Sequence, residues 1–288
     1  MLLGIILVIS ASVMWGLSNI LLKRSIGKGM SPESANAVQT GFSALFMVAI
    51  WIFTICSGFI AFSIPDFWPL IYLLAGTLIG LALGTTIYLH GLKLVDASLA
   101  SPLSSTSPFF VILMATLFLG ENINAFLLLG ALSVFSGIIL LGRREGKKSS
   151  RRKGIFLVSI APVFWAMTII FYRLALKYMD IYTANAIRMS ALGLTMCIYV
   201  RFKGIKCFPE RSALYDSALA GLFNYVLGGT VFLFGLTMIG ASRASALSSG
   251  TPFFTMLFAS MFLKERIKSS YLYGGALVVF GLILISLS

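Results

Sequence analysis

Hydroxyl-bearing residues gather just before a proline at two places in the chain, each inside an apolar segment. They are Ser104, Ser105 and Pro108 at the first place and Ser248, Ser249 and Pro252 at the second. A proline within a helix removes the donor to the carbonyl four residues earlier, here that of Ser104 or Ser248. A carbonyl without a donor cannot face lipid, so it must face protein or a watery cavity. The pattern predicts a central polar binding site with two walls, or hydroxyls that only satisfy their own helices.

Arg188 is the next candidate, because it lies inside an apolar segment that begins near residue 181. It is roughly seven residues into that segment, a depth of about 10 Å at 1.5 Å per residue. A charged side chain at this depth normally faces the interior of a helix bundle or a cavity. Arg188 therefore either binds an anionic group of a substrate or holds carbonyl oxygens at a helix end.

Other candidate contacts for a small solute lie in or close to polar segments. Rings that could stack on a substrate, or simply pack, belong to Trp15, Tyr88, Tyr172 and Tyr225. Asn19 and Gln39 complete the predicted substrate-binding residues.

Groups of residues suited to catalysis or to metal binding are not evident in the sequence. His90 is the single histidine, without an identifiable partner for a proton relay near it in the sequence. All nine acidic residues fall in loops or near helix ends. We predict no enzyme activity, no metal and no cofactor, and the lack of a mid-helix carboxylate disfavours cationic substrates.

The composition places these residues in a membrane protein. Of the 288 residues, 59% are hydrophobic and 11% charged, and the mean hydropathy is +0.99. A soluble domain has about 25% charged residues. So much apolar surface cannot be hidden in one soluble core, which predicts an all-α integral membrane protein. The net charge of +13 fits loops at an anionic lipid surface better than binding to nucleic acid.

The chain is a duplication. Residues 91–123 recur as residues 235–267 without a gap, at a constant offset of 144. Further matches, at offsets between 144 and 150, are 15–19 with 165–169, 35–37 with 184–186, and Gly130 and Gly137 with Gly274 and Gly281. The same alignment makes Gln39 the counterpart of Arg188.

Ten spans are predicted where apolar runs end at charged residues, prolines or polar clusters. They are 2–22, 34–57, 67–90, 97–119, 123–142, 154–174, 181–201, 213–239, 242–263 and 268–287. The first five-helix repeat is residues 1–142, a basic linker is 143–153, and the second repeat is 154–288. Because five is odd, the second repeat enters the membrane from the other face, which predicts two inverted repeats.

Lysine and arginine are concentrated in alternate loops. The loops that join spans one to two, five to six, seven to eight and nine to ten are basic, and the opposite loops carry few such residues. The positive-inside rule predicts that the basic loops are cytoplasmic and that both termini lie outside.

Local signals predict helix contacts and helix starts. Small residues recur every four positions in spans three and eight, as Gly76, Gly80, Gly84 and as Ala220, Asn224, Gly228. This spacing predicts close helix packing, or else a cavity lining. Ser31 and Pro32 are typical of a helix start, and Glu121 and Glu265 are expected to cap spans five and ten.

Several of these features together resemble the EamA-like, ten-span branch of the drug/metabolite transporter superfamily. Besides the duplication, they include Trp15-Gly16, which becomes Trp165-Ala166 in the second half. A pattern of Ala-Ser, Pro-Phe-Phe and Leu-x-Glu starts at Ala97 and again at Ala241. The resemblance covers nearly the whole chain and implies a transporter fold. It does not specify a substrate, and members of this branch usually have the opposite orientation to the one predicted from the basic loops.

We therefore expect a secondary transporter or facilitator of a small polar metabolite in the cell membrane, working by alternating access at a central cavity. The solute is expected to be neutral, zwitterionic or anionic. An amino acid is the first choice, on the resemblance alone. A flippase of lipid-linked headgroups and, more remotely, a membrane enzyme are the alternatives. A monomer could perform this function.

Overall fold

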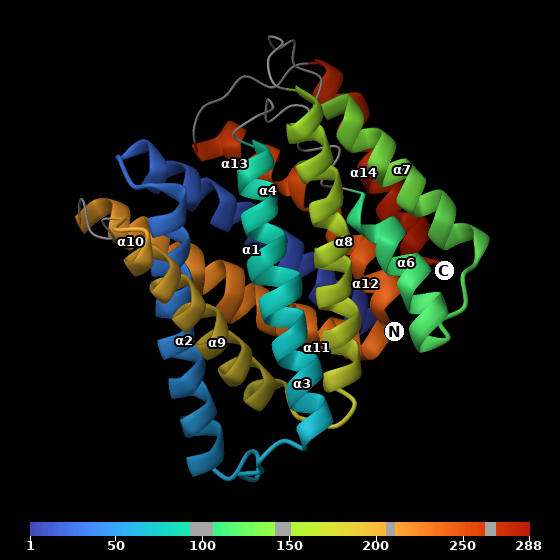
Figure 1. The fold of residues 1–288 in the computed structure, drawn as a ribbon. Coiled ribbons are helices and arrows are strands. Elements are labelled where there is room, and N and C mark those ends of the chain that lie inside the picture. The colour runs from blue at the N-terminus through green and yellow to red at the C-terminus, as the bar shows by residue number, and fades with distance from the viewer. Residues whose placement is uncertain (93–105, 142–150, 206–210, 263–268) are drawn as a thin grey trace.

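The structure is a computed structural model that describes residues 1–92, 106–141, 151–205, 211–262 and 269–288. Its regular elements are all helices, and these residues contain no strand (Figure 1). The helices of the first half are α1 (Leu2–Gly27), α2 (Pro32–Cys56), α3 (Phe67–Ala75), η1 (Gly76–Leu83), α4 (Gly84–Leu92), α6 (Ser107–Leu119) and α7 (Ala125–Leu141). Those of the second half are α8 (Arg151–Ala175), α9 (Ile181–Phe202), α10 (Arg211–Gly221), η2 (Leu222–Gly228), α11 (Gly229–Ile239), α12 (Ala241–Ser248), α13 (Thr251–Phe262) and α14 (Ser269–Ser286).

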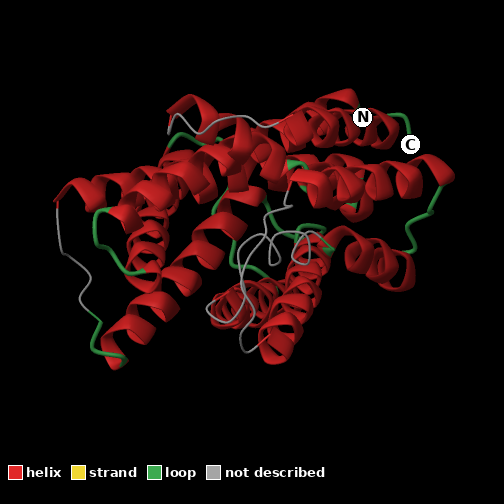
Figure 2. Cartoon of the chain, turned by 90° about the horizontal axis from the view of Figure 1, so that it is seen from above, coloured by secondary structure: helices red, strands yellow, loops and turns green. Residues whose placement is uncertain are grey.

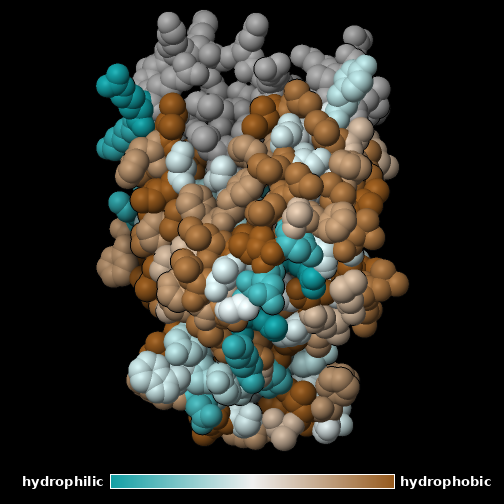
Figure 3. All heavy atoms as spheres, turned by 90° about the vertical axis from the view of Figure 1, so that its right-hand side faces the viewer, coloured by the Kyte–Doolittle hydropathy of each residue, from teal (hydrophilic) through white to brown (hydrophobic). Residues whose placement is uncertain are grey.

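These elements form the predicted ten-span, all-α membrane fold. Spans three and eight are continuous helices with a π-helical middle, η1 and η2, and span nine consists of α12 and α13. By length and composition, five of the described helices can cross a membrane, and three more are apolar but shorter. Hydrophobic side chains cover most of the face in Figure 3, as expected of a surface in contact with lipid.

The second and seventh spans begin with equivalent caps. Ser31 precedes α2, and its hydroxyl accepts a hydrogen bond from Ser34 N at 3.1 Å. Asp180 precedes α9, and its carboxylate accepts one from Thr183 N at 2.9 Å. The two capping residues are 149 positions apart, which is the offset of the duplication here. The caps set the start of both helices, as the sequence predicted for Ser31.

Pro108 and Pro252 do not lie in the middle of helices, so the prediction that they interrupt their spans from within a helix was wrong. α12 ends at Ser248 and α13 begins at Thr251, so Pro252 lies in the first turn of α13. Pro108 likewise lies in the first turn of α6. The first turn is where a missing N–H costs least. The Ser248 carbonyl accepts a hydrogen bond from Thr251 Oγ1 at 2.7 Å. The carbonyl of Ser104 lies outside the described residues.

Helices from the two halves interleave. α1 packs against α11 and α4 packs against α8, and these are equivalent pairs under the duplication. α2 packs against α9, and α7 against α14 (Figure 1), and Figure 2 shows the helical bundle from above. Each half therefore depends on the other for its buried surface.

The contact between α7 and α14 is built on glycines of both repeats. A Cβ atom at Gly130 would lie 2.8 Å from the carbonyl oxygen of Gly281, and one at Gly137 would lie 2.6 Å from that of Gly274. The backbones approach this closely because neither position has a side chain. The partner number falls as the first number rises, so these equivalent helices run antiparallel.

Spans three and eight, which contain the π-helical segments, bind the first helix of the opposite half. Ser18 Oγ donates to the Ala220 carbonyl at 2.9 Å, and its counterpart Thr168 donates from Oγ1 to the Gly76 carbonyl at 3.1 Å. A Cβ atom at Gly80 would lie 2.8 Å from the Phe164 carbonyl oxygen. The close packing predicted from the small residues of span three is thus confirmed.

Candidate functional site

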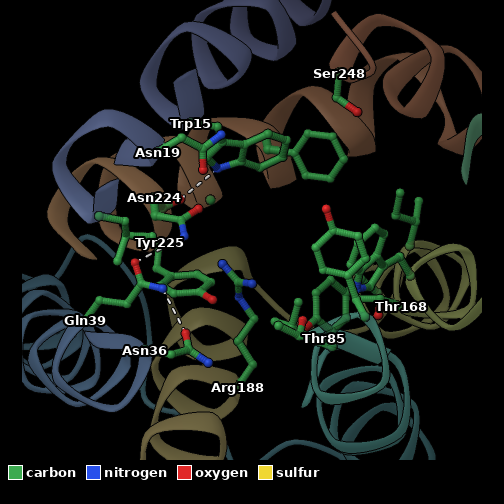
Figure 4. A pocket seen from close by; sticks show the side chains of 18 of the residues that line it. Trp15, Asn19, Asn36, Gln39, Thr85, Thr168, Arg188, Asn224, Tyr225 and Ser248 are labelled. Carbon is green, nitrogen blue, oxygen red and sulfur yellow. Dashed lines mark hydrogen bonds between the residues drawn. The ribbon is translucent and has the colours of Figure 1, made fainter. Parts of the chain in front are cut away.

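A cavity of about 560 Å³ lies between helices of both halves (Figure 4). Its walls come from α1, α2, α4 and η1 of the first half and from α8, α9, α11, α12 and η2 of the second half. Side chains from both repeats thus surround one space, as expected of a substrate site at a repeat interface.

The cavity brings together part of the predicted set. The predicted residues that line it are Trp15, Asn19, Gln39, Tyr88, Arg188 and Ser248, together with the stacking candidates Tyr172 and Tyr225. Pro108, Ser249 and Pro252 are not among the lining residues. Ser104 and Ser105 lie outside the described residues.

The hydroxyls beside Pro252 bond to their own helix. Ser248 Oγ donates to the Ser245 carbonyl at 2.9 Å, and Ser249 Oγ donates to the Ala246 carbonyl at 2.6 Å. These bonds match the alternative in which the serines satisfy their own helix. Ser248 still contributes to the cavity wall, whereas the main polar groups come from other helices.

Arg188 supplies the positive charge of the cavity wall. The residue is 4% exposed, and its Nε donates to Asn185 Oδ1, one turn earlier in α9, at 2.5 Å. Its guanidinium carbon lies 5.3 Å from the centre of the Tyr172 ring, within the range of a cation–π contact. Its Nη2 atom is buried and has no hydrogen-bond partner among the residues that the structure describes. Figure 4 shows the guanidinium directed into the open space.

Amide side chains line the wall near Arg188. Gln39 Nε2 donates to Asn36 Oδ1 at 2.8 Å, and Asn224 Nδ2 is 3.5 Å from Gln39 Oε1. Trp15 Nε1 donates to the Asn224 carbonyl at 2.8 Å (Figure 4). Asn36 was not predicted as a site residue, and Asn224 was named only in a helix-packing pattern that had a cavity lining as its alternative. The Ala-Asn-Ala repeat around Asn36 was a signal for one of them, but it was used only to align the two halves.

Two equivalent aromatic pairs flank the cavity. The rings of Trp15 and Phe232 are 5.1 Å apart, and those of Trp165 and Tyr88 are 5.2 Å apart. Trp165 is the counterpart of Trp15, and Phe232 is the counterpart of Tyr88. Sequence reasoning missed Trp165, although its match with Trp15 was recognised. Thr85 and Thr168 line the same region and were also missed.

The cavity extends towards one end of the bundle. Its lining includes Leu22 and Ile26 in the last turns of α1 and Pro32 at the start of α2, next to the basic loop between them. Leu233 and Phe232, which line the cavity from α11, are buried in the main hydrophobic core. The cavity therefore reaches the end with the basic loops and is closed by apolar packing towards the other end.

A bundle of apolar helices around a shared cavity with polar side chains in its wall is the architecture of a membrane transport protein. The model of the EamA-like transporter family matches residues 2–143 and again residues 152–287. The chain belongs to this family, and it is a multi-pass membrane protein of a transporter family.

Individual proteins agree with this assignment. The chain is 24% identical over 287 residues to an uncharacterized transporter of Archaeoglobus fulgidus, covering 99% of this chain and 98% of that protein. It is 26% identical to the uncharacterized transporter YoaV of Bacillus subtilis over 73% of each chain. A crystal structure with 17% identity superposes with a TM-score of 0.82 over 99% of this chain and 96% of the other. That likeness concerns the fold alone.

Proposed function

We propose that this protein is a secondary transporter or facilitator of a small metabolite that carries a carboxylate, such as an amino acid or a similar organic acid. The observation that carries the proposal is the buried Nη2 atom of Arg188, which faces the cavity and has no partner among the described residues. The substrate's anionic group would complete the hydrogen bonds of this guanidinium.

The cost of burying Arg188 supports this assignment. Removing a charge from water is expensive unless it gains a partner, so a buried cation beside a cavity favours an anion there. The Tyr172 ring and Asn185 hold the guanidinium, and neither neutralises its charge. The cavity-lining residues that the structure describes include no carboxylate, so the wall has a net positive charge.

The remaining wall suits a small amphipathic solute. Amide groups of Asn36, Gln39 and Asn224 can bind an ammonium or a hydroxyl group, and the two aromatic pairs can pack on an apolar body. The arrangement has both polar and apolar partners within a volume suited to a metabolite.

Transport would proceed by alternating access between two inverted five-helix repeats. The antiparallel contact of the equivalent helices α7 and α14 supports an axis in the membrane plane. The equivalent bonds of Ser18 and Thr168 to the opposite half support the same symmetry. Among the residues that the structure describes, the cavity opens towards the basic loops. The structure would then represent one of two access states, the one that faces the cytoplasmic side of the cell membrane by the positive-inside rule.

The proposal is tested by replacing Arg188 with glutamine, the residue that its counterpart Gln39 already supplies. Binding of radiolabelled amino acids and organic acids to the purified protein identifies a ligand, and uptake into proteoliposomes measures transport. In Arg188→Gln we expect affinity to fall about ten- to hundredfold, the equivalent of about 1.5–3 kcal/mol for a charged hydrogen bond.

Arg173→Gln is the matched control. It also removes an arginine from a helix in the membrane, but Arg173 Nη1 binds the Thr237 carbonyl at 2.9 Å and does not line the cavity. Its loss should lower stability without changing substrate affinity. A well-folded Arg188→Gln protein with wild-type affinity for its transported substrates would overturn the assignment.

A further inference from the structure

The closed side of the cavity is made by a contact between α9 and α11. Asn185 Nδ2 donates to Thr230 Oγ1 at 3.0 Å. One turn further from the cavity, the rings of Tyr182 and Phe234 meet edge to face with their centres 5.9 Å apart. Together these two contacts join the start of span seven to the end of span eight.

The counterparts of α9 and α11 are α2 and α4, on the open side. Under the duplication, Asn185 and Thr230 correspond to Asn36 and Thr86 at offsets of 149 and 144. Among the described residues α4 makes no comparable contact with α2, and the cavity lies between them, lined by Asn36 from α2 and Thr85 from α4. On the open side, therefore, the two helices that correspond to α9 and α11 lie apart instead of in contact.

Asn36 and Thr86, which lie apart on the open side, already make the same bonds within their own helices as their counterparts on the closed side. Asn185 Oδ1 accepts from Arg188 Nε at 2.5 Å, and Asn36 Oδ1 accepts from the corresponding Gln39 Nε2 at 2.8 Å. The hydroxyls of the two threonines, in turn, donate to equivalent carbonyls of their own helices. These bonds are Thr230 Oγ1 to Val226 and Thr86 Oγ1 to Ala82. The bond across the helices requires only that α2 and α4 approach each other.

The outer part of this contact differs between the halves. The counterparts of Tyr182 and Phe234 are Glu33 and His90, an acid and a base in place of two aromatic rings. Glu33 lies in the first turn of α2, and His90 lies near the end of α4 with an exposed side chain. The outer pair on the closed side consists of two aromatic rings, whereas its counterpart on the open side consists of two residues that can change charge.

We propose that the cavity closes towards the basic loops when α2 and α4 meet, with Asn36 bonded to Thr86 and Glu33 bonded to His90. This gate rests on the proposed function, because it is one half of the alternating-access cycle. The gate would also make transport sensitive to pH, because histidine changes its charge between about pH 5 and 8. The equivalent aromatic pair on the closed side has no such group.

The hydrogen bonding of His90 fits this role. Its Nδ1 lies 2.8 Å from the Thr86 carbonyl oxygen, which can only accept, so Nδ1 carries the proton. Nε2 then gains a proton when the ring becomes cationic, and it becomes a charged donor for the Glu33 carboxylate. A fall in pH should therefore favour the state that is closed towards the basic loops.

Other charges near this end of the bundle bear on the titration. On the helices packed against α4 and α2 they are Arg152 and Lys153 of α8, Lys23 and Arg24 of α1, Arg201 of α9, and Arg211 and Asp216 of α10, with Lys28 just after α1. Asp216 binds Lys28 Nζ at 2.7 Å and lies 3.6 Å from Arg24 Nε. Lys93 and Asp96, which follow α4, lie outside the described residues.

Cross-linking tests the gate without a known substrate. In a chain with Cys56, Cys197 and Cys207 replaced by serine, the reconstituted variant Glu33→Cys/His90→Cys should form a disulfide under mild oxidation. Tyr182→Cys/Phe234→Cys is the equivalent pair of the closed side and should cross-link as well. Fixing that second pair with a short bifunctional thiol reagent should prevent the first cross-link, because the two closed states exclude each other.

A matched control separates the gate from general mobility. Glu33→Cys/Leu83→Cys places the second thiol at the last residue of η1, directly before α4. Leu83 is exposed and does not line the cavity, so this pair should not cross-link. A well-folded protein that forms the Tyr182→Cys/Phe234→Cys cross-link but no Glu33→Cys/His90→Cys cross-link would overturn the gate and leave the proposed function standing. The Arg188→Gln affinity measurement tests the proposed function separately.

The pH dependence is read from Asn36→Cys/Thr86→Cys, which leaves Glu33 and His90 in place. Its cross-linking yield is compared at about pH 5.5 and about pH 8 with that of the same pair carrying His90→Gln, which has the same thiol chemistry. The yield with His90 in place, divided by the yield with His90→Gln, should be about two- to fivefold higher at the lower pH, as expected for a partly exposed ion pair. An unchanged ratio would overturn the role of His90, and Glu33→Gln should abolish the pH effect just as His90→Gln does.

Discussion

Glu121 of the first repeat caps the helix that starts at Ala241 in the second repeat. Its Oε1 accepts from Ala241 N at 2.6 Å, and its Oε2 accepts from Ser242 N at 2.9 Å. Gly240, with φ of +85°, lets the chain turn directly beneath the carboxylate, where a Cβ atom would lie 2.8 Å from Oε1. The expectation that Glu121 caps span five was wrong, because its carboxylate binds the first turn of span nine. Glu265 lies outside the described residues.

Replacing Glu121 with glutamine should lower the free energy of unfolding by about 1.5–3 kcal/mol, because two charged hydrogen bonds to a helix start are weakened. Thermal unfolding of the purified protein in detergent measures the change. Asp66→Asn is the control, since Asp66 also precedes a helix but makes no capping bond with its side chain. Equal shifts in the two variants would contradict a specific cap.

The Tyr172 ring is expected to orient Arg188 for the substrate. Tyr172→Leu removes the cation–π contact and should weaken substrate affinity by about 0.5–2 kcal/mol. Tyr172→Phe keeps the ring and loses the 3.0 Å hydrogen bond between the hydroxyls of Tyr172 and Thr77. It should retain near wild-type affinity and show only a lower melting temperature. A similar loss of affinity in both variants would assign the effect to the hydroxyl instead.

Gly80 should tolerate no side chain. A Cβ atom there would lie 2.1 Å from Thr168 Oγ1 and 2.9 Å from the backbone nitrogen of the same residue, so α8 would have to move. We expect Gly80→Ala to destabilise the protein by about 1–3 kcal/mol, as overpacking does. Gly41→Ala is the matched helical control, because its Cβ would meet only Cys197 Sγ at 3.8 Å. A thermal shift in detergent distinguishes the two, and a tolerated Gly80→Ala would contradict the packing.

The orientation in the membrane is predicted from the basic loops. In a chain with Cys56, Cys197 and Cys207 replaced by serine, Lys203→Cys lies in a basic loop and Asn122→Cys in a loop at the other end. A membrane-impermeant maleimide applied to intact cells should label Asn122→Cys and should label Lys203→Cys only after the cells are opened. The reverse pattern would place the termini in the cytoplasm, which is the usual orientation in this family.

Much of the fold could be predicted because its signals are local. The lengths of the apolar runs gave the spans, and the Ser31 cap set the start of α2 to within the predicted boundary. The candidate site was predicted less completely. Arg188, Gln39, Trp15, Asn19 and Tyr88 do line one cavity, but Pro252 and Ser249 do not, because the ninth span breaks before the proline and its serines bond to their own helix.

The sequence by itself determined the class of protein, the ten spans, the duplication and the few polar residues that lie within apolar helices. These follow from composition, length and repetition, which need no knowledge of neighbours. The tertiary structure alone decided which polar residues share a cavity, as Asn36 and Asn224 do, and which bind another partner, as Glu121 does at the start of α12. The physical reason is that lipid and the packed interior are both apolar, so hydropathy along a membrane helix does not show which face is turned inward. That face is set by contacts between helices far apart in the chain, such as α1 with α11 and α4 with α8.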